Sequence, residues 1–454
     1  MSYLVHTDAD RALMLRRIGA ASVDDLFTPI PRELRTTALD LPPGSPESEV
    51  AARVTSLAER NRTWGSRSFL GAGCYHIYVP AAVRSLTGRS EFATAYTPYQ
   101  PEVSQGTLQH IFEFQTTISE LTELPVANAS MYDGASALAE GAFLAARHTS
   151  RDGILVSAGV HPEAREVVRT YASGPGLPVA DLALDPSSGR TLVPDAARLE
   201  GAAAVLVQQP NFFGIIEDLE PLTEAAHAAG ALLVVSQNLL AAGLLAPPGQ
   251  VGADVAVGDV QPFGNPPNYG GPFAGFMACA DSYVRQLPGR LVGETLDADG
   301  RRCFTLTMQA REQHIRRAKA TSNICSNQAL CALAATIHLA LLGPTGLREL
   351  GATCIARAHY LHQRLTELPG VSSAHDGPFF NEFAIRLPVD AALFAESLRE
   401  LGVDPGVPLG RFDPAWTPLL LVAVTEINSP RDLDAYVDAA ADALAHPKEA
   451  VHDR

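Results

Sequence analysis

The strongest constraint on the fold is an alternation of short apolar segments with helix-forming segments between residues 154 and 279. The apolar segments carry Val, Leu and Ala at consecutive positions, which is typical of strands that are buried on both faces. This order predicts an α/β fold with a mostly parallel sheet that is covered by helices on both faces. The predicted strands are residues 154–160, 177–184, 203–208, 232–237, 253–260 and 273–279, and helices are predicted at 162–172 and 219–229.

Polar side chains follow these predicted strands at their carboxyl ends. His161 follows the first strand, and Gln208, Gln237 and Asp259 stand at the ends of three later ones. Ligands of open parallel sheets bind beyond the carboxyl ends of the strands, where such side chains converge. We therefore expect a cleft at this edge of the sheet, although a satisfied core would account for a few of these polar residues.

The composition is that of a soluble globular protein, with 46% hydrophobic and 19% charged residues and a formal net charge of −16. The acidic balance argues against a nucleic-acid partner, which would select a basic face. No run of eighteen apolar residues occurs and the N-terminal segment lacks an apolar signal region, so neither a membrane span nor a secretory signal is expected. The six cysteines form no CxxC pair, which predicts free thiols in a reducing cytoplasm and no metal site.

Three parts of the chain are expected from the distribution of these patterns. Residues 1–75 are predicted to form a helical N-terminal arm, with amphipathic helices at 8–18 and 47–60 around a proline-rich link. Residues 76–323 are predicted to form the large α/β domain. Residues 324–454 are predicted to form a small α+β domain, with helices at 346–368, 391–401 and 429–445 and strands at 379–387 and 419–424.

The sequence NASMYDGASALAE (residues 128–140) offers a candidate anion site, because polar and small residues lead into a predicted helix. Gly134 and Ser136 lie in the first turn of that helix, where free backbone amides can bind a phosphate group. The alternative is that Asp133 or Ser130 simply caps the helix. A basic segment at 311–319 precedes a Thr-Ser-Asn turn and a predicted helix at 327–342, and it predicts either an anion contact or a solvated charged face.

The segment FATAYTPYQPEVSQG (residues 92–106) combines prolines and glycine with tyrosines, glutamines and a glutamate. This mixture disfavours a helix and predicts a shaped polar loop. A long helix is expected directly after it, with Ser104 as its N-cap and Leu108, Ile111 and Phe112 at helical spacing.

Several long segments resemble the glycine cleavage system P-protein, in particular its N-terminal half, which is a separate chain (subunit 1, or α) in many bacteria. The resemblance extends from about Leu13 to the last predicted helix. It implies the fold of pyridoxal phosphate (PLP)-dependent transferases of fold type I, with a sheet of the seven-stranded type. The segments are SEFATAYTPYQPEVSQG, ANASMYDGASALAE, VHPEAREVVRTYA, VQQPNFFGIIEDLE, LPGRLVGET, REQHIRRAKATSNICSNQAL and FFNEF.

The resemblance implies a role as one subunit of glycine dehydrogenase (aminomethyl-transferring), an oxidoreductase of glycine catabolism. In that family PLP condenses with glycine, CO2 leaves, and the aminomethyl group passes to the lipoylated H-protein. The stretch 258–275 lies where a fold-type-I enzyme carries its Schiff-base lysine, yet the only lysines of this chain are Lys319 and Lys448. The lysine, and with it PLP, is therefore expected on a subunit 2-like partner in an α2β2 heterotetramer. This chain alone is expected to be inactive, and without its partner it could form a homodimer.

The resemblance also implies roles for particular residues. We expect the polar loop to complete the partner's active site, the Thr-Ser-Asn turn to contact the partner's cofactor phosphate, and the strand ends to retain a vestigial cofactor site. Interface packing is the alternative for the first two segments. The three sets are Tyr96, Thr97, Tyr99, Gln100, Glu102, Ser104 and Gln105; Thr321, Ser322 and Asn323; and Ser130, Gly134, Ser136, His161 and Gln237.

Some positions depart from the family pattern. Gln237 stands where the family more usually has an aspartate that could pair with a pyridine nitrogen, and a neutral glutamine cannot play that part. The segment Tyr75–Tyr78 and the asparagines Asn265 and Asn268 also differ from the usual pattern. Two other functions therefore stay open. One is a paralogous subunit that acts on a modified or carrier-bound glycine, and the other is a non-catalytic scaffold or regulator.

Overall fold

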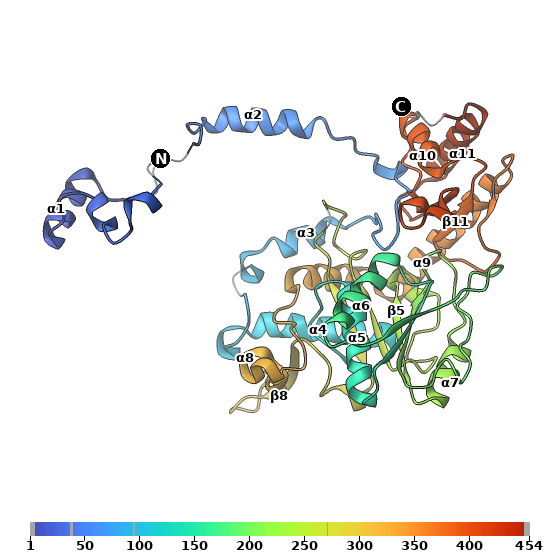
Figure 1. Ribbon diagram of the computed structural model, residues 1–454, viewed down its shortest axis with the longest axis horizontal. Helices are drawn as coiled ribbons and strands as arrows, with labels where there is room; N and C mark the ends of the chain where they lie inside the picture. Colours follow the sequence, from blue (N-terminus) through green and yellow to red (C-terminus); the bar gives the residue numbers. More distant parts are fainter. Residues whose placement is uncertain (1–4, 37–39, 94–95, 270, 449–454) are drawn as a thin grey trace. The chain divides into compact units, whose positions relative to one another are not determined.

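The computed structural model describes residues 5–36, 40–93, 96–269 and 271–448 (Figure 1). The chain divides into two compact units, Met1–Thr63 and Trp64–Arg454. The first unit contains α1 (Asp8–Ile18) and α2 (Glu47–Ala58), and neither helix has a buried residue. Both helices were predicted at nearly these bounds. Because none of the described residues of this unit is buried, its helices form without a core of their own.

The main unit contains a sheet of seven strands in the order β1-β7-β6-β5-β4-β2-β3. Six of its strands run in one direction, whereas β7 runs antiparallel to both of its neighbours, β1 and β6. The mostly parallel sheet is as predicted. The strands are β1 (Val126–Ala127), β2 (Gly153–Ser157), β3 (Val179–Leu182), β4 (Ala202–Gln209), β5 (Leu232–Gln237), β6 (Val255–Asp259) and β7 (Gly275–Cys279).

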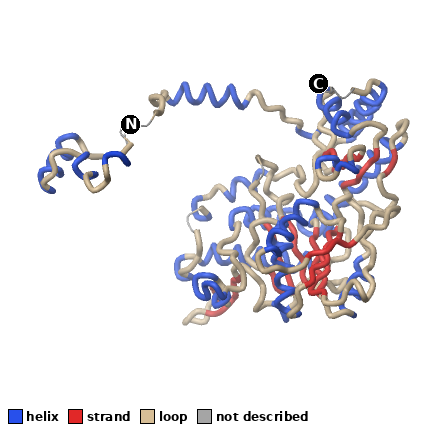
Figure 2. Tube along the Cα trace, viewed as in Figure 1, coloured by secondary structure: helices blue, strands red, loops and turns tan. Residues whose placement is uncertain are grey.

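Helices cover both faces of this sheet, as the near-continuous apolar strands predicted (Figure 2). Alternate residues of β4 illustrate the arrangement. Ala204 and Leu206 pack in one buried cluster with α5 (Gly134–Thr149) and α6 (Pro162–Ser173). Val205 and Val207 pack in another cluster with α7 (Leu219–Ala228).

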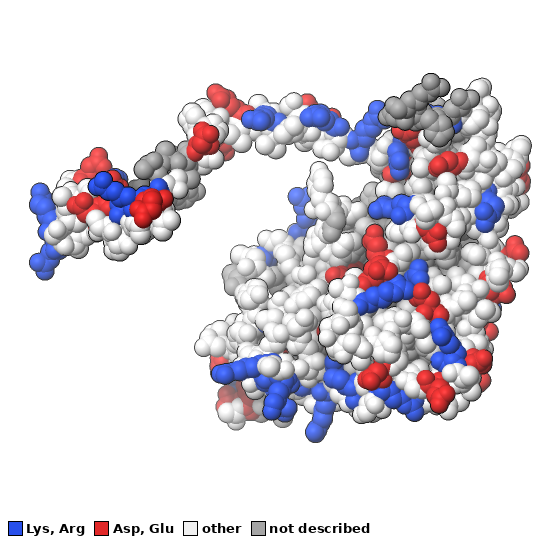
Figure 3. Space-filling view, in the orientation of Figure 1, with Lys and Arg blue, Asp and Glu red and all other residues white. Residues whose placement is uncertain are grey.

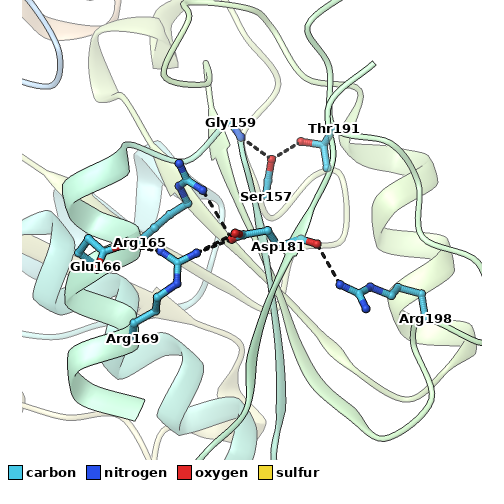
Figure 4. A network of polar contacts seen from close by, with 8 residues as sticks. All are labelled: Ser157, Gly159, Arg165, Glu166, Arg169, Asp181, Thr191 and Arg198. Atoms are coloured by element: carbon cyan, nitrogen blue, oxygen red, sulfur yellow. Dashed lines mark hydrogen bonds and ion pairs between the residues drawn. The ribbon is translucent and has the colours of Figure 1, made fainter. Parts of the chain in front are cut away.

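Strand β3 is the outermost strand on its side of the sheet, and charged side chains surround it (Figure 4). Arg169 of α6 donates to both carboxylate oxygens of Asp181 at 2.7 and 2.8 Å, and Arg165 lies 3.5 Å from the same carboxylate. Arg198 donates to the backbone carbonyl of Asp181 at 3.0 Å. These contacts cover the edge strand and oppose its pairing with another strand.

A second sheet of four antiparallel strands lies in the C-terminal part, in the order β10-β11-β13-β12. Helices α10 (Ala391–Glu400) and α11 (Pro430–Ala445) pack on it. Phe69 belongs to the same core, since its ring meets Tyr436 edge-on at 4.7 Å and its amide donates to the carbonyl of Asp404 at 2.8 Å. Residues 64–75, which the sequence assigned to the arm, thus pack in the main unit. The strands are β10 (Ser372–Ser373), β11 (Glu382–Arg386), β12 (Val407–Pro408) and β13 (Leu419–Ala423).

Helix α9 (Ala329–Thr366) combines the two predicted helices 327–342 and 346–368, which meet at a kink. Gly343 has φ 59° at the kink and Pro344 follows it. Among the described residues, α9 is the one helix long and apolar enough, by length and composition alone, to cross a membrane. We interpret it as a core helix, because Leu339, Leu350 and Leu361 on its two halves are buried in the main unit.

An antiparallel hairpin of β8 (Leu291–Leu296) and β9 (Arg302–Thr307) precedes the basic segment at 311–319, and it was not predicted. The short helix α8 (Gln313–Arg316) follows it. The hairpin packs on α4 (Gln105–Thr122), the long helix predicted after the polar loop. On the face shown in Figure 3, basic side chains lie along the edge of the main unit around α8 and β8.

The two helices that begin with capping boxes offer a test of which helices matter for stability. We expect Ser429→Ala to lower the free energy of unfolding of the main unit by about 1 kcal/mol, because it removes the cap of α11, which is buried on one side. The matched variant Thr7→Ala removes the same motif from α1, which buries nothing, and should leave that free energy unchanged. Urea unfolding of both variants checks this, and equal losses would contradict it.

Candidate functional site

A cavity of about 400 Å³ lies at the carboxyl ends of the parallel strands of the main sheet. His161 after β2, Gln208 of β4, Gln237 of β5 and Asp259 of β6 all line it. The first turn of α5 closes one side through Gly134 and its neighbours. The structure therefore brings together the strand-end residues that the sequence pattern predicted to converge.

The N-terminus of α5 carries two carboxylates. Asp133 is the N-cap, and its Oδ1 accepts from the amide of Ser136 at 2.7 Å. Asp259 Oδ2 accepts from the amide of Gly134 at 3.2 Å. The capping alternative thus holds for Asp133, whereas the Ser130 hydroxyl is buried and accepts instead from the amide of Gln328 at 3.0 Å.

Of the five residues predicted for a vestigial cofactor site, the structure places three at this cavity and two away from it. Gly134, His161 and Gln237 line the cavity. Ser136 lies in the first turn of α5, where its hydroxyl donates to the carbonyl of Asp133 at 3.2 Å. Ser130 and Ser136 therefore have structural partners within the fold and are not among the residues that line the cavity.

Burial controls the protonation of the titratable groups at the cavity. It raises the pKa of Asp259 to about 7, against the opposing effect of amide donors that include Gln261 N at 2.7 Å. Burial also lowers the pKa of His161, whose Nδ1 accepts from the amide of Glu163 at 3.1 Å, so the imidazole is neutral at pH 7. The side-chain oxygen of Gln237 is buried without a hydrogen-bond partner.

The polar loop predicted to reach a partner's active site is largely exposed. Tyr96 is 85% exposed and Tyr99 is 56% exposed. Gln100 and Glu102 are exposed as well, and Thr97 is half-buried with no hydrogen-bond partner for its hydroxyl.

The last two residues of this set have more structural roles. Ser104 occupies the predicted N-cap position of α4, but its side chain makes no capping hydrogen bond. Gln105 donates to the carbonyl of Phe304 and accepts from the amide of Phe304, both at 2.9 Å. It joins the start of α4 to strand β9, so its side chain is already used within the chain.

Arg290 connects the polar loop to the segment that contains the Thr-Ser-Asn turn. Its guanidinium lies 5.8 Å from the centre of the Tyr99 ring and donates to Asn327 Oδ1 at 3.4 Å. It also lies 4.0 Å from the carboxylate of Glu312. Because Arg290 is only 3% exposed, it holds these segments together from the interior. Its role was not predictable from sequence, since one arginine among many carries no signal of burial.

The Thr-Ser-Asn turn is partly tied to the main sheet domain. The Thr321 amide donates to the carbonyl of Arg311 at 3.0 Å, and the Ser322 hydroxyl donates to Glu140 Oε1 at 2.6 Å. Asn323 is exposed, as is Lys319 at the end of the preceding 3-10 turn. None of the three turn residues lines the strand-end cavity.

Comparison with known proteins identifies the family. The family model for the glycine cleavage system P-protein matches residues 1–439. The chain belongs to the P-protein family. A P-protein relative from Exiguobacterium sibiricum, described as "Probable glycine dehydrogenase (decarboxylating) subunit 1", is 50% identical over 440 residues, which cover 96% of this chain and 98% of the relative. A relative of the same description from Moorella thermoacetica is 49% identical over 448 residues, covering 98% and 100%.

Solved structures agree with this assignment. The crystal structure of glycine decarboxylase (P-protein) of the glycine cleavage system, in inhibitor-bound form, is 49% identical with a TM-score of 0.89, covering 97% of this chain and 100% of that one. A sphingosine-1-phosphate lyase from Burkholderia pseudomallei shares the fold at 16% identity and a TM-score of 0.65, covering 91% and 94%. The predicted fold of type I PLP-dependent enzymes is thus confirmed for this P-protein family member.

The residues of the cavity do not fit PLP, the cofactor of this fold class. Among the described residues that line it there is no lysine to hold the aldehyde as a Schiff base. The amide of Gly134, which could bind a phosphate, already has a carboxylate partner. Gln237 offers no negative charge to a pyridinium nitrogen. The cavity of this P-protein chain is therefore rich in hydrogen-bond acceptors and lacks a nucleophilic amine.

Proposed function

We propose that this chain is the lysine-less subunit of a heteromeric, PLP-dependent glycine decarboxylase. The complex would release CO2 from glycine and pass the aminomethyl group to a lipoyl carrier protein such as the H-protein. The observation that carries the proposal is the match of about 50% identity over 96% of the chain to subunit 1 proteins. The absence of a lysine from the described lining of the cavity supports the assignment of the Schiff-base lysine to a partner subunit.

The remaining features of the assembly belong to this proposal. A subunit 2-like chain would carry the Schiff-base lysine and PLP, which supplies the electron sink for decarboxylation. The two chains would form an α2β2 heterotetramer in the cytoplasm. Within the main unit of this chain, residues 76–323 and 324–454 would act as a large and a small domain, in keeping with their separate sheets.

In this proposal the polar loop is the part of the chain that completes the partner's active site. Exposed hydroxyl groups at Tyr96 and Tyr99 can donate to the carboxylate of glycine or to the partner's cofactor phosphate. Tyr99 is backed by the buried Arg290, which favours one position of its ring. The exposed Asn323 and its neighbours Thr321 and Ser322 would contribute the second contact to the partner's cofactor phosphate.

Reconstitution tests the proposed function. PLP absorbance and glycine–bicarbonate exchange are measured for this chain alone and after mixing with the subunit 2-like chain from the same genome. We expect neither signal from the chain alone and exchange after mixing. A coloured complex that ignores glycine would indicate a paralogous subunit with another substrate. Full exchange by the partner chain alone would indicate a scaffold.

We expect Tyr96→Phe to lower exchange by the mixture at least about tenfold, the effect of losing one hydrogen bond of ~1.5 kcal/mol to a charged group. The melting temperature should not change, because Tyr96 is 85% exposed. Tyr360→Phe is the matched control, since its hydroxyl is bonded to Asp434 at 2.6 Å on the surface of the C-terminal part. Full activity of Tyr96→Phe would exclude the Tyr96 hydroxyl from the partner's site.

A further inference from the structure

The N-terminus of α5 is built like an anion site. Backbone amides of the first turn and the positive end of the helix dipole favour a negative group there. Gly134 and Ala135 of this turn both line the strand-end cavity. A phosphorylated ligand in the cavity would therefore be expected to place its phosphate at this point.

The position is already filled by a side chain from the sheet. Asp259 Oδ2 accepts from the amide of Gly134 at 3.2 Å, and its Oδ1 accepts from the amides of Gln261 at 2.7 Å and Ala274 at 3.5 Å. Both carboxylate oxygens are thus committed to backbone amides. Asp259 bridges the end of β6, the loop after it, the segment before β7 and the start of α5.

The start of α5 also packs closely on the backbone at the end of β6. A Cβ atom on Gly134 would lie 3.1 Å from the carbonyl carbon of Gly258 and 3.3 Å from the amide nitrogen of Asp259. The start of α5 is therefore pressed against the end of β6. A phosphate could reach the Gly134 amide only if the Asp259 side chain moved away.

The charges at the cavity also oppose an anion. Asp133 and Asp259 both line it, as does the exposed Glu163. No lysine or arginine occurs among the described lining residues, and the one histidine, His161, has a pKa lowered by burial. A phosphate dianion here would meet carboxylates but no cation among the lining side chains, because Arg165 and Arg411, which act on His161, lie outside the lining. Such contacts are unfavourable in a partly buried site.

We propose that the carboxyl group of Asp259 occupies the place of a phosphate group at the start of α5 and thereby bars phosphorylated ligands, PLP included, from this cavity. The inference deepens the proposed function, because it gives the physical reason why the cofactor would belong to the partner subunit. Asp259 is thus the residue that determines the ligand class of the site. Its removal should restore an anion site in a chain that still lacks the lysine.

The test uses the full chain alone and inorganic phosphate as the probe, measured by titration calorimetry. Wild-type chain should show no saturable binding. Asp259→Ser frees the Gly134 amide and removes the charge, and it should bind phosphate at least about tenfold more tightly than wild type, as expected for gaining one charge-assisted hydrogen bond. Absorbance of bound PLP should likewise be higher for Asp259→Ser than for the wild-type chain, and neither should show the band of an internal Schiff base.

Glu163→Gln is the matched control, because it removes a carboxylate from the same cavity without freeing an amide of α5. It should bind phosphate no better than wild type. A gain in affinity equal to that of Asp259→Ser would show that charge alone, and not occupancy of the Gly134 amide by Asp259, excludes phosphate. If Asp259→Ser does not fold, Asp259→Ala also frees the Gly134 amide, and it should bind phosphate more tightly than wild type.

Saturable phosphate or PLP binding by the wild-type chain overturns the proposal whatever the variants do, and so does a folded Asp259→Ser that ignores phosphate. The proposed function fails in a different way, through missing glycine exchange after mixing with the partner chain. The two failures are therefore distinguishable.

Discussion

Replacing Gly214 by alanine is expected to lower the free energy of unfolding of the main unit by more than about 3 kcal/mol. Gly214 has φ 83°, and a Cβ atom at this position would lie 1.8 Å from the carbonyl oxygen of Glu382. Neither side of that contact can yield easily. The Gly214 carbonyl accepts from the amide of Phe380 at 3.2 Å, and Glu382 lies in β11, paired with β13. The loop after β4 is therefore fixed against the C-terminal sheet.

Gly201→Ala is the control that measures the cost of the backbone conformation without the cost of the close contact. Gly201 has φ 73°, similar to Gly214, but a Cβ atom there would meet nothing within 4 Å. Gly201→Ala should lower the free energy of unfolding by only about 1 kcal/mol, which is the strain of an alanine in the left-handed backbone region. Urea unfolding of the two variants measures the difference. Equal stability of Gly214→Ala and Gly201→Ala would show that the loop after β4 does not approach β11 as closely as described.

Arg290→Ala is expected to destabilise the main unit by about 3–5 kcal/mol and to lower activity of the reconstituted complex. The variant takes the buried arginine away from Glu312, which is 8% exposed and keeps the partly exposed His314 at 3.6 Å, and it removes the cation beside Tyr99. A buried carboxylate that loses its interior cation bears most of its desolvation cost. Thermal unfolding measures the first effect. Glycine–bicarbonate exchange at a temperature where the variant is folded measures the second.

Arg302→Ala is the matched control for this prediction. Arg302 and Glu294 form an ion pair at 2.8 Å on the neighbouring hairpin, but their side chains are 60% and 44% exposed. Removal of such a surface pair costs about 0–1 kcal/mol. The double variant Arg290→Met/Glu312→Gln should be more stable than Arg290→Ala, because it leaves no uncompensated buried charge. If it is less stable, the cost of Arg290→Ala lies in packing and not in charge.

The fold was largely predictable because its signals are local. The buried strands β4 and β5 are continuous apolar runs, and residues such as Val205 and Val234 are fully buried between two helical layers. The predicted bounds of β5 are those of the structure. Strand pairing is less local. Sequence alone did not show that β7 is antiparallel or that the two-residue strand β1 lies at the sheet edge.

The hairpin of β8 and β9 was missed although it carries a usable signal. The sequence DADGR between the strands contains an Asp-Gly pair at a turn, flanked by segments of β-forming residues. Its strands are half-exposed, so their apolar pattern is weak. The arginines nearby favoured the interpretation of this part of the chain as an anion contact or a solvated charged face. The missed hairpin matters, since Gln105 anchors the predicted partner loop to it.

In the candidate site, too, local features were predictable from sequence, whereas contacts between distant segments were not. The convergence of His161, Gln237 and Asp259 follows from their positions at strand ends, which sequence reports. That Asp259 reaches the amide of Gly134, 125 residues away in the chain, depends on the packing of α5 against β6. No pattern in either segment reports this contact. The roles of Tyr96 and Asn323 stay predictions, because the partner that would test them is a second chain.

The scarcity of lysine has a practical consequence for mapping the assembly. Lys448 is held by Glu400 at 2.7 Å and Glu396 at 3.7 Å, whereas Lys319 is exposed two residues before Thr321. Amine-directed chemistry therefore has only two side-chain targets on this subunit, and the one without a recorded ion pair among the described residues, Lys319, stands beside the face proposed to meet the partner. A cross-linked peptide that contains Lys319 would report the neighbouring chain at a single defined point, without any engineered label.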